Sequence, residues 1–205
     1  MILQSDFKKL VLASGSSGRR KLLLEAGYDF SVVVSEVPEI LAENEDPELY
    51  VVRLARAKAA AVSSLLHQKN DALSSKNVVL AADTVVVSPE GKVLEKPISI
   101  EDSIEMLKGL SGRAHYVVTG CAIFLEKNLE YLFVDKAKIV MREYDLDDIF
   151  VYIKDGETLL CSGGYSIANR AASFIERVEG SFTTVVGLPM HLVVPYLKKL
   201  GVRAV

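Results

Sequence analysis

The strongest constraint on how this chain folds is an almost unbroken apolar run, NVVLAADTVVV, at residues 77–87. A valine-rich run of this length is typical of a β-strand that is covered on both faces of its sheet. Asp83 stands inside the run, and an ionised carboxylate in a buried strand is costly unless it is paired or bound to a metal. Two accounts stay open at this point. Asp83 caps the strand end or pairs with a buried lysine, or it is a hard-cation ligand or general base at the end of a central strand.

The segments around this strand alternate between strand patterns and helix patterns. We expect strands at 8–12 and 29–35, helices at 19–26 and 48–66, and a helix from Ser99, which resembles the start of a capping box, through Leu110. The helix at 48–66 places one apolar stripe on a single side, formed by Val51, Leu54, Ala55, Ala61, Val62 and Leu65. Two long strand patterns, 115–126 and 131–144, are separated only by KNLE and predict a hairpin. This order predicts an α/β fold with a mixed twisted sheet flanked by helices, in one domain over residues 1–205 that can form two lobes around one cleft.

Composition excludes several classes of function. The formal net charge of −3 argues against a binder of nucleic acid polymers, although it does not forbid one basic cleft. No uncharged apolar run reaches the roughly 18 residues of a membrane helix, and the start MILQSDFKKL lacks the layout of a signal peptide, so we expect a cytoplasmic protein without a membrane partner. The two cysteines, Cys121 and Cys161, form no CxxC motif, which makes a zinc site or a disulfide framework an unfavourable interpretation.

A serine–arginine turn, LASGSSGRR at residues 12–20, lies between the first strand pattern and the first helix pattern. A helix N-terminus exposes unpaired N–H groups and the positive end of a dipole, so it attracts anions. Hydroxyl groups from Ser14 and Ser16 and the guanidinium of Arg19 would complete a phosphate-binding site. The alternative is a serine-rich N-cap followed by two solvated arginines, and the turn alone does not decide between them. Neither a P-loop nor a dinucleotide-binding glycine motif is present.

Three more residues can join Asp83 in one site. Glu39, in a polar loop, would be a second carboxylate for Mg2+, which prefers few carboxylates together with water and phosphate oxygens. Lys58 lies on the apolar side of its helix, where a lysine often extends its ammonium group to solvent, and Lys96 in LEKP can equally be an exposed loop residue. Together these residues would supply two carboxylates for a metal and several cations for a polyphosphate. That combination suits hydrolysis of a phosphoanhydride.

Seven segments occur in an order that resembles the Maf family, often labelled septum-formation-inhibitor proteins. They are LASGSSGRRKLL, EVPE, VRLARAKA, AADTVVV, LEKP, LSGRAHYVVTG and GSFTTVVGLP. The resemblance covers about residues 10–200. It implies a nucleoside triphosphate pyrophosphatase that converts an NTP and water to an NMP and pyrophosphate, with a divalent cation, Mg2+ or Mn2+, as cofactor. It also implies an elongated architecture with a central cleft, like that of inosine triphosphatases, often as a homodimer.

The resemblance also implies roles for single residues. Asp83 matches the presumed proton acceptor, with Lys58 and Lys96 as further catalytic groups, and Glu39 and Asp83 would hold the metal. Ser14, Ser16, Arg19, Lys58 and Lys96 match positions that bind the triphosphate. Gly18, Thr84 and Ala168 occupy positions that bear on base specificity.

Several positions depart from the family pattern and bear on the choice of base. This chain reads SSGRR where many members read SPRR, and Pro38 replaces a frequent acidic residue before Glu39. Thr84 matches a branch resembling dTTP/UTP enzymes, whereas Cys161 resembles a branch of 7-methyl-GTP enzymes. We therefore expect a preference for pyrimidine or modified nucleotides, with a flatter substrate profile, because the small residues Gly18 and Ala168 remove hydrogen-bond partners and widen the pocket.

Other functions remain as alternatives. These are a 7-methyl-GTP pyrophosphatase, an inosine-type pyrophosphatase, a nucleotide-binding regulator of cell division or septum formation with little turnover, and a purely structural interaction protein. The acids and lysines named above argue against the last two, because neither needs a hydrolytic set of residues.

Overall fold

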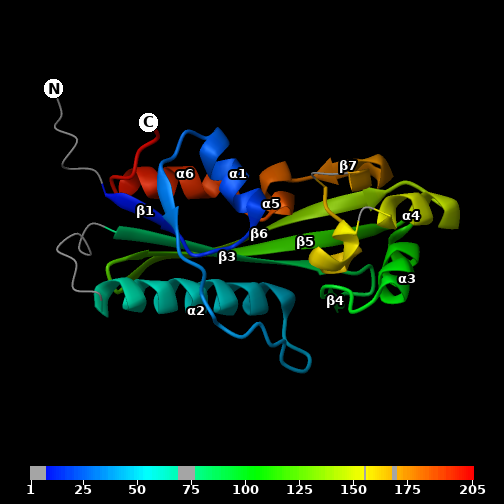
Figure 1. Ribbon diagram of the computed structural model, residues 1–205, viewed down its shortest axis with the longest axis horizontal. Coiled ribbons are helices and arrows are strands. Elements are labelled where there is room, and N and C mark those ends of the chain that lie inside the picture. Colours follow the sequence, from blue (N-terminus) through cyan, green and yellow to red (C-terminus); the bar gives the residue numbers. More distant parts are fainter. Residues whose placement is uncertain (1–7, 69–76, 155, 168–169) are drawn as a thin grey trace. The chain divides into compact units, whose positions relative to one another are not determined.

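The computed structural model describes residues 8–68, 77–154, 156–167 and 170–205 (Figure 1). The strands are β1 (Lys9–Leu12), β2 (Phe30–Val32), β3 (Asn77–Val87), β4 (Val93–Leu94), β5 (Ala114–Leu125), β6 (Asn128–Met141) and β7 (Ile175–Glu179). The helices are α1 (Ser17–Glu25), α2 (Pro47–Gln68), α3 (Ile100–Leu110), α4 (Leu146–Ile153), α5 (Phe182–Val186) and α6 (Met190–Lys199), with short 3-10 turns at η3 (Glu157–Leu160), η4 (Ser162–Gly164) and η5 (Arg170–Phe174).

The strands form one seven-stranded sheet in the order β2-β1-β3-β5-β6-β7, with β4 paired to β3. β1 runs parallel to both β2 and β3, whereas β4 is antiparallel to β3 and β7 is antiparallel to β6. The expected mixed sheet flanked by helices is therefore confirmed. The hairpin expected at 115–144 is also present, because β5 and β6 are neighbours joined by a two-residue turn at Glu126 and Lys127.

β1 is much shorter than β3, and this difference positions the site described below. The last paired residues are Leu12 and Leu80, after which the N–H of Ala13 donates to the carbonyl of Leu80 at 2.8 Å. β3 continues to Val87. The serine–arginine turn follows β1 directly. It therefore begins beside the part of β3 that lies shortly before Asp83.

The chain divides into two compact units, which are described separately. Unit 1 comprises Met1–Asp83, Gly120–Val134 and Gly187–Val205, and unit 2 comprises Thr84–Thr119 and Asp135–Val186. β3, β5 and β6 contribute residues to both units.

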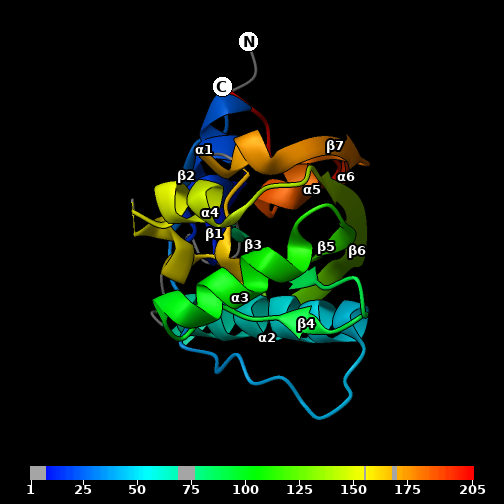
Figure 2. The same cartoon turned by 90° about the vertical axis from the view of Figure 1, so that its right-hand side faces the viewer.

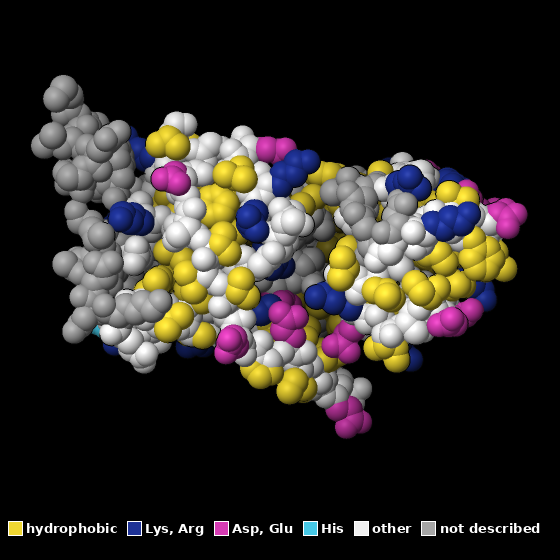
Figure 3. Space-filling model, in the orientation of Figure 1, with side chains coloured by type: hydrophobic (Ala, Val, Ile, Leu, Met, Phe, Trp, Pro, Cys, Tyr) yellow, Lys and Arg dark blue, Asp and Glu magenta, His cyan; other side chains and the backbone are white. Residues whose placement is uncertain are grey.

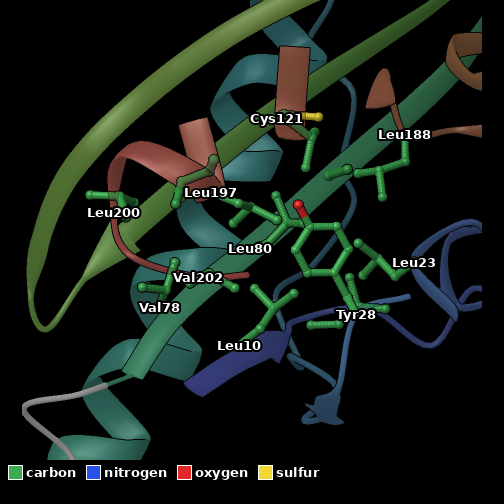
Figure 4. Packing of buried hydrophobic residues seen from close by; sticks show 14 residues of the cluster. Leu10, Leu23, Tyr28, Val78, Leu80, Cys121, Leu188, Leu197, Leu200 and Val202 are labelled. Carbon is green, nitrogen blue, oxygen red and sulfur yellow. The ribbon is translucent and has the colours of Figure 1, made fainter. Parts of the chain in front are cut away.

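In unit 1, helices cover both faces of β1 and β3. Figures 1 and 2 show α2 on one face and α1 and α6 on the other. Val78 and Leu80 pack into the cluster with α1 and α6 that Figure 4 shows, while Val79 and Ala81 pack against α2. This alternation follows from the two-residue repeat of a strand, and it explains why the run 77–87 is apolar at successive positions.

α2 approaches the sheet very closely at Gly120 of β5. A Cβ atom added at Gly120 would lie 2.5 Å from the carbonyl carbon of Val51 and 2.6 Å from its oxygen. Real Cβ contacts are not this short, so only glycine fits between the strand and the helix at this point.

Unit 2 has its own apolar core. It joins Leu107 of α3, Ile149 and Tyr152 of α4, and Ile139 of β6. The expected start of α3 is confirmed, because the Ser99 hydroxyl caps the helix by accepting the N–H of Asp102 at 3.1 Å.

Some predictions about individual elements need correction. The expected strand at 29–35 is limited to Phe30–Val32 in β2. The apolar stripe expected on α2 is buried at Val51, Leu54, Ala55 and Val62. Ala61 and Leu65 were also expected there but are exposed, and Ala59 and Ser63 are buried instead. Among the described residues, no helix is long and apolar enough to cross a membrane.

Candidate active site

The serine–arginine turn holds one arginine inside the protein. Ser16 is the N-cap of α1, and its hydroxyl accepts the N–H of Arg19 at 3.4 Å. The Arg19 side chain is buried, with Nη1 donating to Ser14 Oγ at 2.9 Å and Nε donating to the carbonyl of Gly187 at 2.8 Å. The alternative of an N-cap with two solvated arginines therefore holds for the cap and for exposed Arg20, but it is wrong for Arg19.

Burial and nearby charges act on Arg19 in opposite directions. Burial lowers the pKa of its guanidinium from the usual value, while the negative charges of Asp83 and Glu39 and the thiol of Cys121 raise it. An arginine remains protonated under such conditions because its usual pKa is so high. The site therefore contains a fixed, partly desolvated positive charge close to the carboxylates.

Lys58 joins the two predicted metal ligands. Its Nζ donates to Asp83 Oδ1 at 2.5 Å and also to Glu39 Oε1. The side chains of Lys58 and Asp83 are each 9% exposed, whereas that of Glu39 is 53% exposed. Lys58 therefore does not extend to solvent, and the first account of Asp83, pairing with a buried lysine, describes its contact correctly. This contact leaves a role in binding or catalysis equally open.

Opposing effects act on the pKa of the Asp83 carboxyl group. Burial raises the pKa of its carboxyl group above the usual value, Lys58 and Arg19 lower it, and Glu39 raises it, so that the net shift is upward. A carboxylate with a raised pKa is a stronger base than a solvated one. A raised pKa in a buried cluster that also contains two cations marks the position as a functional candidate.

The two carboxylates have a geometry compatible with a divalent cation. Glu39 and Asp83 converge on one ammonium group, so their oxygens already surround a single positive charge. Among the described residues, no group of three or more acidic, histidine or cysteine side chains is arranged to hold a metal. Two carboxylates suffice for Mg2+ when phosphate oxygens and water complete its coordination, so the residues fit this ion only together with a phosphate ligand.

The remaining predicted residues do not all join this cluster. Lys96 is exposed and belongs to unit 2, shortly after β4. Gly18 is half-buried in the first turn of α1, and Thr84 is half-buried in β3 with its hydroxyl 2.9 Å from that of Thr119. Ala168 lies outside the described residues.

Two contacts in the structure have no clear signal in the sequence. The carbonyl of Gly187, which fixes Arg19, belongs to the segment GSFTTVVGLP, and Gly187 has a φ of 109° that other residues rarely adopt. Thr119 and Thr184, which support Thr84, lie in LSGRAHYVVTG and in the same GSFTTVVGLP segment. Both segments stand out in the sequence, but a carbonyl oxygen or a threonine hydroxyl is too common to identify as a site group in advance.

The face of the molecule shown in Figure 3 carries acidic and basic side chains interspersed with each other. Neither sign of charge dominates this face.

Comparison with known proteins gives one family and a consistent set of relatives. The family described as Maf-like protein matches residues 9–200. A protein named dTTP/UTP pyrophosphatase from Geobacillus sp. (strain WCH70) is 40% identical over 95% of this chain and 99% of its own length. A protein of the same name from Vibrio cholerae is 39% identical over 89% of this chain and 93% of its own length.

A solved structure shows only a distant likeness. It is the crystal structure of a nucleoside-triphosphatase / dITP/XTP pyrophosphatase from Mycobacterium abscessus, which aligns with 65% of this chain and 74% of its own, at 15% identity and a TM-score of 0.40. A similarity this low supports no conclusion about the present chain.

Proposed function

The chain belongs to the Maf family, and from this premise we propose that it is a nucleoside triphosphate pyrophosphatase that prefers dTTP and UTP. The reaction is hydrolysis of an NTP to an NMP and pyrophosphate. The names of the relatives support the pyrophosphatase activity and the choice of pyrimidine substrates.

One observation carries the assignment to a site. Lys58 holds the carboxylates of Asp83 and Glu39 together, and Asp83 is buried with a raised pKa. A protein that needed only a stable core would favour apolar residues here, because a buried ion pair adds little net stability compared with well-packed apolar side chains. The presence of this buried ion pair therefore supports a role in binding or catalysis rather than in stability.

The residues divide the proposed reaction between them. Arg19, oriented by Ser14 and Gly187, binds phosphate oxygens, with Ser16 and the first turn of α1 beside it. Asp83 accepts a proton from the water that attacks the α-phosphorus, and its raised pKa makes it better suited to this step than a solvated aspartate. Lys58 stabilises the negative charge that builds up during the attack, and Lys96 is proposed to do so on the departing pyrophosphate.

Glu39 and Asp83 would hold the divalent cation, Mg2+ or Mn2+. When bound, such an ion neutralises phosphate charge and makes a coordinated water more acidic. Lys58 would then move from between the carboxylates towards the phosphates, which its flexible four-carbon side chain allows.

A product analysis tests the proposal. Purified protein is incubated with dTTP, UTP, CTP, GTP and 7-methyl-GTP in the presence of Mg2+, and the products are separated by ion-exchange chromatography. We expect the monophosphate and pyrophosphate from dTTP and UTP at the highest kcat/KM, and we expect Asp83→Asn to abolish both products. Release of orthophosphate with a diphosphate, or at least about a hundredfold preference for 7-methyl-GTP, would contradict the proposal.

A further inference from the structure

The loop that carries Glu39 is fixed to α2 by contacts that the proposed reaction does not use. Residues 39–45 form no helix or strand, and they lead from the segment after β2 to the start of α2 (Figure 1). The Glu39 side chain is half-exposed, so burial does not fix its carboxylate. A loop side chain that has to bind an ion loses conformational entropy unless the protein already holds it in place. The loop, α2 and Asp83 all belong to unit 1.

Arg53 of α2 makes three hydrogen bonds to this loop. Its Nε donates to Glu45 Oε1 and its Nη2 to Glu45 Oε2, both at 2.7 Å, and Nη2 also donates to the carbonyl of Ile40 at 3.0 Å. Two parallel bonds between a guanidinium and a carboxylate fix the relative orientation of both groups. Arg53 thereby connects the two ends of the loop, because Ile40 directly follows Glu39 and Glu45 lies just before α2.

Neighbouring hydrogen bonds close the loop further. Glu45 Oε2 also accepts the N–H of Ala42 at 3.1 Å, and the N–H of Glu45 donates to the carbonyl of Ala42 at 3.1 Å. The Tyr50 hydroxyl donates to the carbonyl of Glu39 at 3.3 Å, and the guanidinium carbon of Arg53 lies 5.4 Å from the centre of the Tyr50 ring. The backbone at Glu39 is therefore bonded to the same helix from which Arg53 extends.

Stability alone does not account for this arrangement. The Arg53 side chain is 48% exposed, and ion pairs between exposed side chains contribute little to stability. The arrangement matters because Lys58 also holds the Glu39 carboxylate, beside Asp83. In the proposed reaction Lys58 turns towards the phosphates, and its contact with Glu39 is then lost. The bonds from Arg53 begin five residues earlier on α2 and do not involve Lys58, so they continue to hold the loop.

We propose that Arg53 is a positioning residue that keeps the Glu39 carboxylate at the metal site when Lys58 leaves it. This inference rests on the proposed function, because it requires that Glu39 and Asp83 bind a divalent cation. Residues that orient a metal ligand without contacting the ion contribute to metal affinity, and their loss commonly weakens binding about ten- to a hundredfold. Loss of the Arg53 side chain should therefore weaken metal binding while leaving the fold in place.

Mn2+ binding, followed by electron paramagnetic resonance, tests this without turnover. The protein is titrated with Mn2+ in the presence of α,β-imido-UTP, in which a nitrogen replaces the oxygen of the bond that is proposed to break. We expect Arg53→Met to raise the dissociation constant of Mn2+ about tenfold or more, and Arg53→Lys to raise it as well, because lysine keeps the charge but cannot make the paired bonds. Removal of a positive charge would by itself favour a cation, so weaker binding cannot arise from net charge.

Arg56→Met is the matched control for this titration. Arg56 is exposed on the same helix, and among the described residues it makes no hydrogen bond to the loop 39–45. Its variant loses the same charge and should bind Mn2+ as wild type does. Hydrogen exchange of the metal-free proteins supplies a second measurement: the amide of Ala42, which donates to Glu45, should exchange faster in Arg53→Met than in Arg56→Met.

Glu45 supplies an independent test of the same contact. Glu45→Ala should weaken Mn2+ binding to a similar extent, and the double variant with Arg53→Met should bind no more weakly than either single variant, because both changes remove one shared interaction. Fully additive losses would contradict an action of Arg53 through Glu45.

The outcomes separate this inference from a role in stability and from the proposed function. An unchanged dissociation constant of Mn2+ in Arg53→Met, with or without a lower midpoint of urea unfolding, would overturn the positioning role, as would wild type that binds no Mn2+ beside the analogue. Wild type that forms no monophosphate and pyrophosphate from any NTP would instead overturn the proposed function.

Discussion

Replacement of Lys58 by methionine should lower the free energy of unfolding by an amount that depends on pH. Lys58 Nζ lies 2.5 Å from Asp83 Oδ1, and both side chains are 9% exposed. Methionine is of similar length and carries no charge, so the variant mainly leaves the Asp83 carboxylate buried without its cation. Removal of one partner from a buried ion pair costs about 3–5 kcal/mol.

The pH dependence arises because Asp83 can escape the penalty by binding a proton. Protonation costs about 1.4 kcal/mol for each pH unit above the usual carboxyl pKa of 3.8. The cost of burying the unpaired Asp83 carboxylate therefore cannot exceed about 6 kcal/mol at pH 8 or about 2 kcal/mol at pH 5, because the group would otherwise bind a proton. The folded variant binds a proton at Asp83 more readily than the unfolded chain does, so a fall in pH should recover stability.

Urea unfolding at pH 8 and pH 5 measures both quantities. We expect Lys58→Met to lose about 3–5 kcal/mol at pH 8 and less than about 2 kcal/mol at pH 5, and the double variant with Asp83→Asn to recover most of the loss. Lys138→Met is the control, because the Lys138–Glu179 pair at 3.3 Å is partly exposed and should contribute less than about 1 kcal/mol. An equal loss at both pH values, or no recovery in the double variant, would refute the reasoning.

Four further outcomes are expected. Asp83→Asn should lower kcat for UTP at least about a hundredfold in a pyrophosphate-release assay, and near-normal turnover would limit Asp83 to a structural role. Arg19→Ala and Lys96→Ala should each raise KM and lower kcat, because both cations are proposed to contact charge that grows on the leaving group; normal steady-state kinetics in both would leave the serine–arginine turn as a helix cap only. EDTA should stop turnover and Mg2+ or Mn2+ should restore it, whereas full activity in the chelator would remove the metal from the scheme. Burial lowers the pKa of His115 from 6.5 to about 4, so between these pH values the unfolded chain binds a proton that the folded chain does not. The free energy of unfolding should therefore fall as pH drops between these values. A His115→Gln variant whose free energy of unfolding, measured in urea, kept the same pH dependence would contradict this.

Local patterns in the sequence predicted the elements that local forces determine. The strand at 77–87, the cap at Ser99 and the hairpin turn all depend on residues that are neighbours in the chain, and all three are present. The stripe of α2 was wrong at Ala61 and Leu65 because the buried face continues from Ala55 through Ala59 to Ser63, at steps of four residues. An apolar pattern does not anticipate a serine in a buried position.

The candidate site was predictable at Asp83, where a charged residue interrupts an apolar strand. It was not predictable at Gly187, where a backbone carbonyl makes the contact. Asp83 was conspicuous inside an apolar strand, and a buried lysine was one of its expected partners. Nothing in the sequence pairs it with Lys58 in particular, because that contact depends on how α2 packs across β3. The carbonyl of Gly187 gave even less indication, since every residue has a carbonyl and only the fold selects this one.

The close approach at Gly120 makes the candidate site sensitive to a position that does not belong to it. Lys58 follows Val51 by two helical turns, so the distance between α2 and β5 at Gly120 also sets how far Lys58 reaches towards Asp83. A single methyl group at position 120 would force the helix outwards by a large fraction of an ångström, comparable with the difference between a formed and a broken hydrogen bond. Clearance at one glycine therefore limits how much variation this site tolerates, in addition to the requirement for the charged residues themselves.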